Sequence, residues 1–531
     1  MPSKVNLNLP TQSKLSFFVI TLTFIVFVGS ILIIISTPWG PGLREDSFSY
    51  ITAAESFYEG TGLGRWAADG TFRPLTHFPP LLPWLLAGLR ILGLEYVLAA
   101  RLLNAFLFGI SSYLVGISLF VLTESRKVAL IGAAMSCISN VLLGIFSWAH
   151  SEPLYIVLNM ASLISLALYL RNPARSGYLL TAIAATALTF LTRFAGIALI
   201  CASTLTMLIF PWGELKRRVK VSSLFVLLSS APTAIFIMRN RILYGTTVDR
   251  PLPQWHPPPA TTWAQGADTI LGWFAPHRIF SSMSNTAVIV AGTLITLSLF
   301  IAFAFASYQM YRRFLSANLP IQPLWFLSLT NLLAYCGLLM VTVLFLDRLT
   351  PLNDRILSPI YPLLLLMLPA LGNFWLDGRH QSIKILLSVI LVVFLGVFVF
   401  RGIQTIRTQR ELGLGLSTPQ WHTSKAMEYL RTLPSVPIYT NDIPAIYFHA
   451  DRMAHFIPVK QNPAEGTIRQ DYPAEMLIMR QRLLDGKGIL ILFGTDPEAR
   501  LHSAEFSDLV FGLEEVTGFE GAVVYRSPTI K

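Results

Sequence analysis

Long apolar runs separated by short polar segments dominate the chain as far as about residue 400. The first run, residues 17–36, is uncharged and matches the ~20 residues with which a helix crosses a bilayer. We expect spans of this kind at 17–36, 96–122, 128–147, 154–170, 178–192, 195–211, 221–238, 286–308, 323–346, 356–376 and 385–400. The pattern therefore predicts an α-helical polytopic membrane protein with about 11 transmembrane helices.

Lysines and arginines are concentrated in alternate connections between the apolar runs. Lys4 and Lys14 precede the first run, and a basic cluster at 216–220 follows the sixth. Such basic connections mark the cytoplasmic side of a membrane protein. We therefore expect a multi-pass protein of the plasma (inner) membrane with a cytoplasmic N-terminus, a large first outer loop at 37–94 and an extracytoplasmic C-terminal segment.

The pattern changes after about residue 415. Residues 424–433 have the spacing of a short amphipathic helix, whereas 437–442 and 488–493 have the composition of short strands. Alternating helix and strand signals are typical of a small α/β domain. We therefore divide the chain into a transmembrane domain at 1–410 and an extracytoplasmic α/β domain at 415–531.

The first outer loop carries a pair of carboxylates, Glu45 and Asp46, within a stretch that we expect to be a long polar loop, residues 37–80. Residues 78–92 are apolar but too few to span a bilayer, and we expect them to form a helix at the membrane interface. Carboxylates in such a loop either keep it in water or form part of a site. The rest of the chain favours a site.

Composition narrows the class of protein. Hydrophobic residues make up 53% of the chain and charged residues 13%, and the mean hydropathy is +0.58. The net charge of +11 lies in short connections between apolar runs rather than in a patch interleaved with aromatic residues, so a nucleic-acid surface is excluded. The three cysteines lie inside apolar runs and form no CxxC motif, which indicates neither zinc nor a redox centre.

Under this topology, the ionisable residues at membrane depth gather on the outer side. They are Glu45, Asp46, His77, Glu152, Arg193, Asp249, His256, Asp347, Arg348, Asp354 and Arg355. Ionisable groups at membrane depth are costly and need a partner or a polar cavity. Each one alone is also explained as an interface residue. Acids and arginines together on one face favour a site that binds an anion and moves a proton.

Several motifs resemble those of the GT-C membrane glycosyltransferases, which include protein O-mannosyltransferases, aminoarabinose transferases and related lipopolysaccharide sugar transferases. The segment Asp46 to Tyr50 resembles their Asp-acid-x-x-Tyr signature after the first span. Further similar motifs, in the same order, are Thr76-His77-Phe78-Pro79-Pro80-Leu81, Ala99-Ala100-Arg101-Leu102-Leu103-Asn104, Ser151-Glu152-Pro153-Leu154, Leu191-Thr192-Arg193-Phe194-Ala195-Gly196 and Asn353-Asp354-Arg355-Ile356-Leu357-Ser358-Pro359. The resemblance covers about residues 15–400.

The resemblance implies a reaction and assigns roles to residues. A sugar would move from a polyprenyl-phosphate donor to a hydroxyl of an envelope lipid, glycan or protein on the outer face, with inversion at the anomeric carbon. Asp46 would be the general base. Candidates for binding the substrates are Glu45, Tyr50, His77, Glu152, Arg193, Asp354 and Arg355. Arginine suits the leaving phosphate because its planar donors match phosphate geometry. Glu152 would orient a sugar hydroxyl, anchor an arginine or only form a local ion pair.

Two departures from the family pattern change these expectations. The second acid of the signature is Ser47 here, and the additional acid, Glu45, precedes Asp46 instead. No cofactor motif is present, and a role for a divalent cation stays open because that second acid is missing. The basic position before the two prolines is His77, whose charge depends on pH.

Two other classes of function remain. A transporter or flippase of lipid-linked sugars would explain the spans, the intramembrane charges and a lipid groove. It would not need an acid signature in an outer loop or an outer α/β domain. A non-catalytic scaffold is the third interpretation, because Ser47 breaks the acid pair. No glycine-rich phosphate loop is present, so a cytoplasmic nucleotide-sugar donor is not supported.

Overall fold

The structure, a computed structural model, describes residues 12–248, 253–276, 279–280, 282–317, 322–347, 350–376, 381–433, 436–460, 468–494, 506, 509–516 and 519–528. The chain forms two compact units. The first comprises Met1–Pro38, Thr76–Leu82 and Ala99–Arg410, and the second comprises Trp39–Leu75, Pro83–Leu98 and Glu411–Lys531. Each unit is described by itself below.

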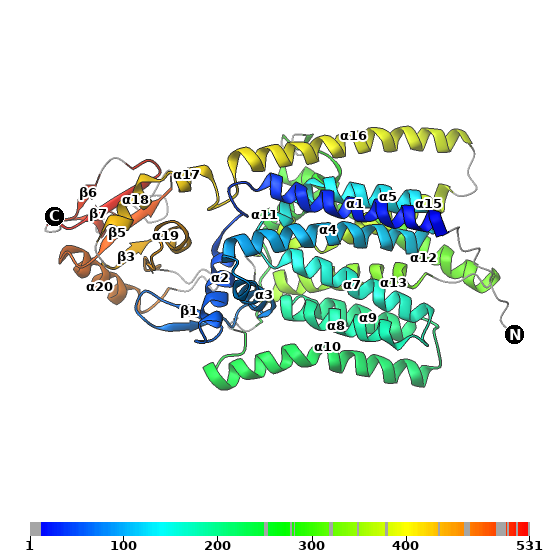
Figure 1. The fold of residues 1–531 in the computed structure, drawn as a ribbon, viewed down its shortest axis with the longest axis horizontal. Helices are drawn as coiled ribbons and strands as arrows, with labels where there is room; N and C mark the ends of the chain where they lie inside the picture. Colours follow the sequence, from blue (N-terminus) through cyan, green and yellow to red (C-terminus); the bar gives the residue numbers. More distant parts are fainter. Residues whose placement is uncertain are drawn as a thin grey trace. The chain divides into compact units, whose positions relative to one another are not determined.

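The first unit is a bundle of helices whose long members run in about the same direction (Figure 1). Its helices are α1 Gln12–Ser36, α4 Tyr96–Thr123, α5 Arg126–Ile138, α6 Asn140–Phe146, α7 Glu152–Arg171, α8 Ser176–Thr192, α9 Gly196–Ile209, α10 Leu215–Tyr244, α11 Ala260–Phe274, α12 Asn285–Ala317, α13 Pro323–Val341, α14 Asp354–Leu357, α15 Ile360–Leu376 and α16 Gln381–Leu412, with a π-helix at Thr342–Leu346. The prediction of an α-helical polytopic membrane protein is confirmed.

A helix lies at each of the predicted spans, but their lengths differ. Within the described residues, seven helices are long and apolar enough to cross a membrane, and the bent pair α5 and α6 adds an eighth. The helices at the other three predicted spans, α8, α9 and α15, are apolar but shorter. The structure therefore does not confirm a count of 11 spans.

The predicted third span, 128–147, is two helices rather than one. The axes of α5 and α6 meet at 55°. Ser139 has an extended backbone at this point, and its hydroxyl accepts a hydrogen bond from the Leu142 amide at 3.3 Å, which caps α6. The same hydroxyl donates to the Tyr361 hydroxyl of α15 at 3.0 Å. The break is thus stabilised by polar contacts on both sides.

Helix α7 lies at the centre of the bundle and packs against α8, α9 and α13. Polar pairs join these helices inside the apolar surroundings. Asn331 donates to Asn159 at 3.0 Å, and the hydroxyls of Ser162 and Thr186 lie 2.6 Å apart. Such hydrogen bonds between helices satisfy buried polar groups and fix the register in which the helices pack.

Arg101, within the family-like motif at 99–104, fixes the end of α1. Its Nη2 donates to the Ile34 carbonyl at 2.8 Å and its Nε donates to Thr37 Oγ1 at 3.1 Å. A cation at the C-terminus of a helix satisfies carbonyls that lack helical partners and complements the helix dipole. In the first unit this motif therefore has a structural role.

The second unit combines a short helical part with an α/β part. Its elements are α2 Glu45–Tyr58, β1 Gly64–Trp66, β2 Phe72–Pro74, most of α3 Leu81–Ile91, α17 Pro419–His422, α18 Lys425–Thr432, β3 Ile438–Thr440, α19 Ile443–Ala450, β4 His455–Phe456, α20 Tyr472–Leu484, β5 Ile489–Phe493, β6 Glu514–Val516 and β7 Ala522–Arg526. The prediction of a long polar loop at 37–80 is wrong for residues 45–58, which form α2.

The α/β part is built on a five-stranded sheet in the order β4-β3-β5-β7-β6. Strand β3 pairs in parallel with β4 and β5, whereas β7 pairs antiparallel with β5 and β6. Strand β5 lies within the strand predicted at 488–493, and all five of its residues are buried. Met479 and Leu483 of α20 pack with Leu490 and Leu492 in the core. The prediction of a small C-terminal α/β region is confirmed.

Candidate functional site

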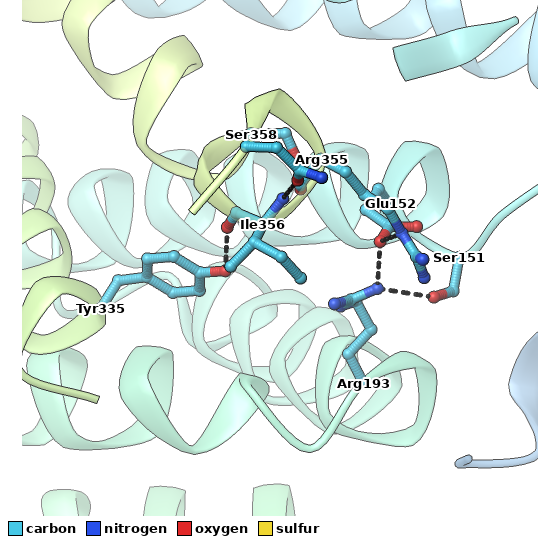
Figure 2. A network of polar contacts seen from close by, with 8 residues as sticks. Ser151, Glu152, Arg193, Tyr335, Arg355, Ile356 and Ser358 are labelled. Carbon is cyan, nitrogen blue, oxygen red and sulfur yellow. Dashed lines mark hydrogen bonds and ion pairs between the residues drawn. The ribbon is translucent and has the colours of Figure 1, made fainter. Parts of the chain in front are cut away.

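Glu152, Arg193 and Arg355 form a charged cluster in the first unit (Figure 2). Oε1 of Glu152 accepts from Nη1 of Arg193 at 2.5 Å and from Nε of Arg355 at 2.6 Å. The side chain of Glu152 is only 1% exposed, whereas those of Arg193 and Arg355 are 18% and 28% exposed. The Glu152 carboxylate is thus buried, whereas the two guanidiniums that contact it are partly exposed.

Helix α7 supplies the carboxylate. Glu152 is in its first turn, followed by Pro153, whose ring is tolerated there because the first amides of a helix have no helical partner. A negative charge in the first turn also interacts favourably with the helix dipole. Nη1 of Arg193 additionally donates to the hydroxyl of the neighbouring Ser151 at 3.1 Å.

Arg193 lies at the break between α8 and α9. It follows the last residue of α8, and its extended backbone ends the helix there. Gly196 opens α9 and lies against the preceding helix. A Cβ atom at this position would be 2.6 Å from Cα of Phe190, which only a glycine avoids. The Arg193 to Gly196 motif therefore encodes the tight turn that positions the arginine.

Arg355 lies in α14, a helix of one turn. Asn353 caps this helix, because its side-chain oxygen accepts from the Ile356 amide at 3.2 Å. The hydroxyl of Ser358 donates to the Arg355 carbonyl at 2.7 Å. The polar residues of the Asn353 to Ser358 motif thus hold the short helix that presents Arg355 to Glu152.

Two buried tyrosines fix the segments that carry the arginines. The Tyr335 hydroxyl of α13 donates to the Ile356 carbonyl at 2.7 Å (Figure 2), and the Tyr155 hydroxyl of α7 donates to the Ala195 carbonyl at 3.3 Å. Both rings are almost fully buried, with centroids 6.5 Å apart. Neither tyrosine was among the residues predicted for the site. A hydroxyl inside an otherwise apolar span was the signal that could have identified them.

The chemistry of the cluster follows from its charges. One carboxylate meets two guanidiniums, so the three side chains together carry an excess of positive charge. Among the described residues, Oε2 of Glu152 has no hydrogen-bond partner. Guanidiniums held in place by a buried acid are suited to bind an oxyanion, phosphate above all, through paired hydrogen bonds.

Asp354, the residue before Arg355, connects this cluster to an apolar cavity. Its Oδ1 accepts from Nε1 of Trp273 at 2.8 Å. Trp273 lines a cavity of about 350 Å³ whose other walls come mainly from α5, α15 and α16, with Tyr361, Leu368 and Phe398 among them. The single turn α14 therefore presents one side chain to the charged cluster and the next one to the edge of an apolar cavity.

Three of the predicted residues belong to the second unit. Glu45 and Asp46 are in the first turn of α2, where Glu45 is exposed and Asp46 half-buried, and Tyr50 is buried one turn later. Ser47, at the position of the missing second acid, is fully buried. Its hydroxyl accepts from the Arg44 amide at 3.2 Å as part of a capping box. Serine at this position therefore has a structural function.

The remaining predicted outer residues are not in the charged cluster. His77 is exposed. Its ring forms an edge contact with the Phe78 ring, and the two ring centroids are 4.8 Å apart. Asp347 accepts from the Thr350 hydroxyl at 3.1 Å. Asp249 and Arg348 lie outside the described residues. In the part of the chain that the structure describes, no three His, Cys, Asp or Glu side chains are grouped so that they could hold a metal ion.

Similar proteins were found by comparison of structures but not by comparison of sequences. No protein-family model matches the sequence, and neither does any curated protein. The structure of ArnT from Cupriavidus metallidurans bound to undecaprenyl phosphate aligns with 96% of this chain and 98% of its own, at 13% identity and a TM-score of 0.55.

Two structures of an archaeal oligosaccharyltransferase are also similar. The Archaeoglobus fulgidus enzyme tethered to an acceptor peptide aligns with 94% of this chain and 74% of its own, at 13% identity and a TM-score of 0.52. The same organism's AglB in complex with an inhibitory peptide and a dolichol-phosphate aligns over the same shares, at 12% identity and a TM-score of 0.50. The chain therefore has the fold of GT-C membrane glycosyltransferases, as the motif resemblance predicted.

Proposed function

We propose that the protein is a membrane glycosyltransferase that moves a sugar from a polyprenyl-phosphate carrier to a hydroxyl of an envelope lipid, glycan or protein. The observation that carries the proposal is the position of α14, which presents Arg355 to the charged cluster and Asp354 to the edge of the apolar cavity. A polyprenyl phosphate has the same two parts, a phosphate joined to a hydrocarbon chain. Two similar structures contain such carriers, undecaprenyl phosphate and dolichol-phosphate.

The reaction has one bond-forming and one bond-breaking event. The acceptor oxygen attacks the anomeric carbon, the bond from that carbon to the phosphate oxygen breaks, and its electron pair leaves with the phosphate. The proton of the acceptor hydroxyl passes to Asp46, which we assign as general base. Attack from the side opposite the phosphate inverts the anomeric carbon. Arg193 and Arg355 stabilise the negative charge that develops on the leaving phosphate.

The other predicted residues have supporting roles in this proposal. Glu152 holds both guanidiniums in place and is a positioning residue for them. His77 adds a further donor for the phosphate, and Glu45 and Tyr50 flank the base along α2. The reaction is placed at the outer face of the plasma membrane, with the acceptor approaching from the extracytoplasmic side.

A transfer assay tests the proposal. Purified protein is incubated with a panel of radiolabelled polyprenyl-phosphate sugars and envelope lipids, and labelled acceptor is measured. Arg193→Lys and Arg355→Lys retain charge but lose the guanidinium fork, so the apparent affinity for donor should fall. Arg218→Lys is the matched control, because its guanidinium binds the Leu208 carbonyl outside the cluster. Unchanged donor affinity in both cluster variants would remove the arginines from the site. Transport of the lipid in vesicles without sugar transfer would support a transporter instead.

A further inference from the structure

The second unit contains a polar cavity that the proposed reaction does not use. Its volume is about 250 Å³. Helix α2 supplies one wall, β1 a second, and α19 with the residues after it a third. The lining side chains are Thr52, Glu55, Ser56, Glu59, Arg65, Trp66, Tyr447, Asp451, Arg452 and Met453.

Some of these side chains build the walls. The Tyr447 hydroxyl donates to Oε2 of Glu55 at 2.7 Å and so joins α19 to α2. Arg452 is held by two backbone carbonyls, those of Leu430 at 2.9 Å and Val436 at 2.8 Å. The Arg65 guanidinium lies 5.2 Å from the centre of the Phe48 ring. These contacts fix the cavity without filling it.

Other side chains in the cavity are available to a ligand. Within the described residues, the carboxylates of Glu59 and Asp451 form no hydrogen bond or ion pair, and both residues are exposed. The ring of Trp66 is 44% exposed and forms an edge contact with the Phe72 ring, with the ring centroids 5.3 Å apart. The cavity therefore combines hydrogen-bond acceptors with an accessible aromatic ring.

Three carboxylates, of Glu55, Glu59 and Asp451, and two guanidiniums, of Arg65 and Arg452, line the cavity, so negative charge is in slight excess. Glu55 and Glu59 lie at the C-terminal end of α2, and Asp451 lies at the C-terminal end of α19. The dipole of a helix favours positive charge at this end, so acids here are not explained by helix stability. A ligand that brings hydrogen-bond donors satisfies these carboxylates, and the slight excess of acids favours a neutral or cationic ligand over an anionic one.

We propose that this cavity binds one ring of a neutral or basic saccharide. The carboxylates of Glu59 and Asp451 accept hydrogen bonds from its hydroxyl or ammonium groups, and the apolar face of the ring stacks on Trp66. The volume, about 250 Å³, lies just below the roughly 300–1,000 Å³ that is usual for small-molecule pockets, which suits a single ring. This deepens the proposed function, on which it rests, because it makes the acceptor a glycan or glycolipid.

Direct binding of saccharides to the full-length protein in detergent tests whether the cavity is a saccharide site, and this measurement does not depend on any transfer reaction. Saturation-transfer NMR would be recorded with glucose, glucosamine, N-acetylglucosamine and glucuronic acid as probes. The first three should bind more tightly than glucuronic acid. Trp66→Ala should weaken binding about tenfold, as expected for loss of an aromatic contact, and Trp66→Phe should restore most of it. Glu59→Gln and Asp451→Asn should each weaken binding about fivefold.

The control variant is Glu428→Gln, which removes an exposed acid of α18 in the same unit. Equal binding in all cavity variants, binding of glucuronic acid as tight as that of glucose, or binding of Mg²⁺ with no saccharide would overturn the inference. Absence of sugar transfer with intact saccharide binding would instead count against the proposed function alone. Transfer that proceeds while no saccharide binds would overturn only the cavity assignment.

Discussion

Glu152 is the residue on which the arrangement of the two arginines depends. Glu152→Gln keeps the size of the side chain but removes the charge that holds Arg193 and Arg355 together. Breaking a buried ion pair from one side costs about 3–5 kcal/mol, because the remaining charges lose their partner. We expect a clear fall in the unfolding temperature in detergent together with loss of donor binding. An unfolding temperature equal to that of the Glu428→Gln control would contradict this role.

Asp46 is the residue on which the proposed chemistry depends. Asp46→Asn is nearly isosteric and should retain folding, membrane insertion and donor binding. Turnover should fall by roughly 10²–10⁴, the usual contribution of a positioned general base. Glu45→Gln is the matched variant one position earlier and should have a smaller effect. Near-normal turnover in Asp46→Asn, measured in the transfer assay, would end its assignment as the base.

The residues of the charged cluster could be predicted from sequence only in part. Ionisable residues inside apolar runs identified Glu152, Arg193 and Arg355 as candidates, because burial of such groups requires a partner. Their mutual contacts could not be predicted, because they depend on how α7, α8 and α14 pack. Ser47 was taken as a broken acid pair, whereas its burial and its bond to the Arg44 amide show a cap.

At the scale of the element, the turn between α8 and α9 connects backbone geometry to the charged cluster. Gly196→Ala places a Cβ against the backbone of Phe190 and should force the turn, and Arg193 with it, to shift. Overpacking of this kind costs about 1–3 kcal/mol. We expect a lower unfolding temperature and weaker donor use.

The control is a second glycine of the same region. Gly177, in the first turn of α8, has nothing within 4 Å of the position of a Cβ. Gly177→Ala should therefore leave stability unchanged or raise it slightly, since alanine is the better helix former. If the two substitutions have equal effects on unfolding temperature and on transfer, the close contact at Gly196 has no functional importance.

Hydropathy predicted the positions of the membrane helices better than their ends or continuity. The break at Ser139 was missed because the apolar run 128–147 gives no signal that the helix ends. The break is stabilised by the hydrogen bond from Ser139 to Tyr361 of α15, a contact that depends on the packing of the helices. Helix α2 was missed because its polar first turn was assigned to a loop. Residues on several faces of α2, Phe48, Tyr50 and Ile51 among them, are buried, so the helix lacks the one-sided apolar pattern that identifies an amphipathic helix.

At the scale of the whole molecule, sidedness is the first property to test. We expect the connection between α9 and α10 to be cytoplasmic and the α/β part of the second unit to be outside. Single cysteines introduced in a background without the three native cysteines, Arg217→Cys and Lys425→Cys, should react with a membrane-impermeant reagent from opposite sides. Equal labelling of both positions in intact cells would contradict the topology.

The second unit should also become less stable in acid. Burial lowers the pKa of His449 by more than the hydrogen bond from its Nε2 to the Leu416 carbonyl, at 2.7 Å, raises it. Because the folded state disfavours the charged ring, His449 contributes stability above the ordinary pKa of about 6.5, and this is lost as the pH falls through the lowered value. The unfolding temperature should fall as the pH is lowered below about 6.5, and His449→Gln should reduce that fall.

The pairing of two guanidiniums with a single carboxylate has a consequence for turnover. The donor is a phosphodiester with one negative charge, whereas the spent carrier is a monoester that loses a second proton with a pKa of about 6. Near neutral pH the cluster therefore attracts the product of the reaction more strongly than its substrate. Under the proposed function the enzyme is inhibited by its own by-product. Its rate in the cell then depends on how quickly the membrane around it is cleared of used carrier.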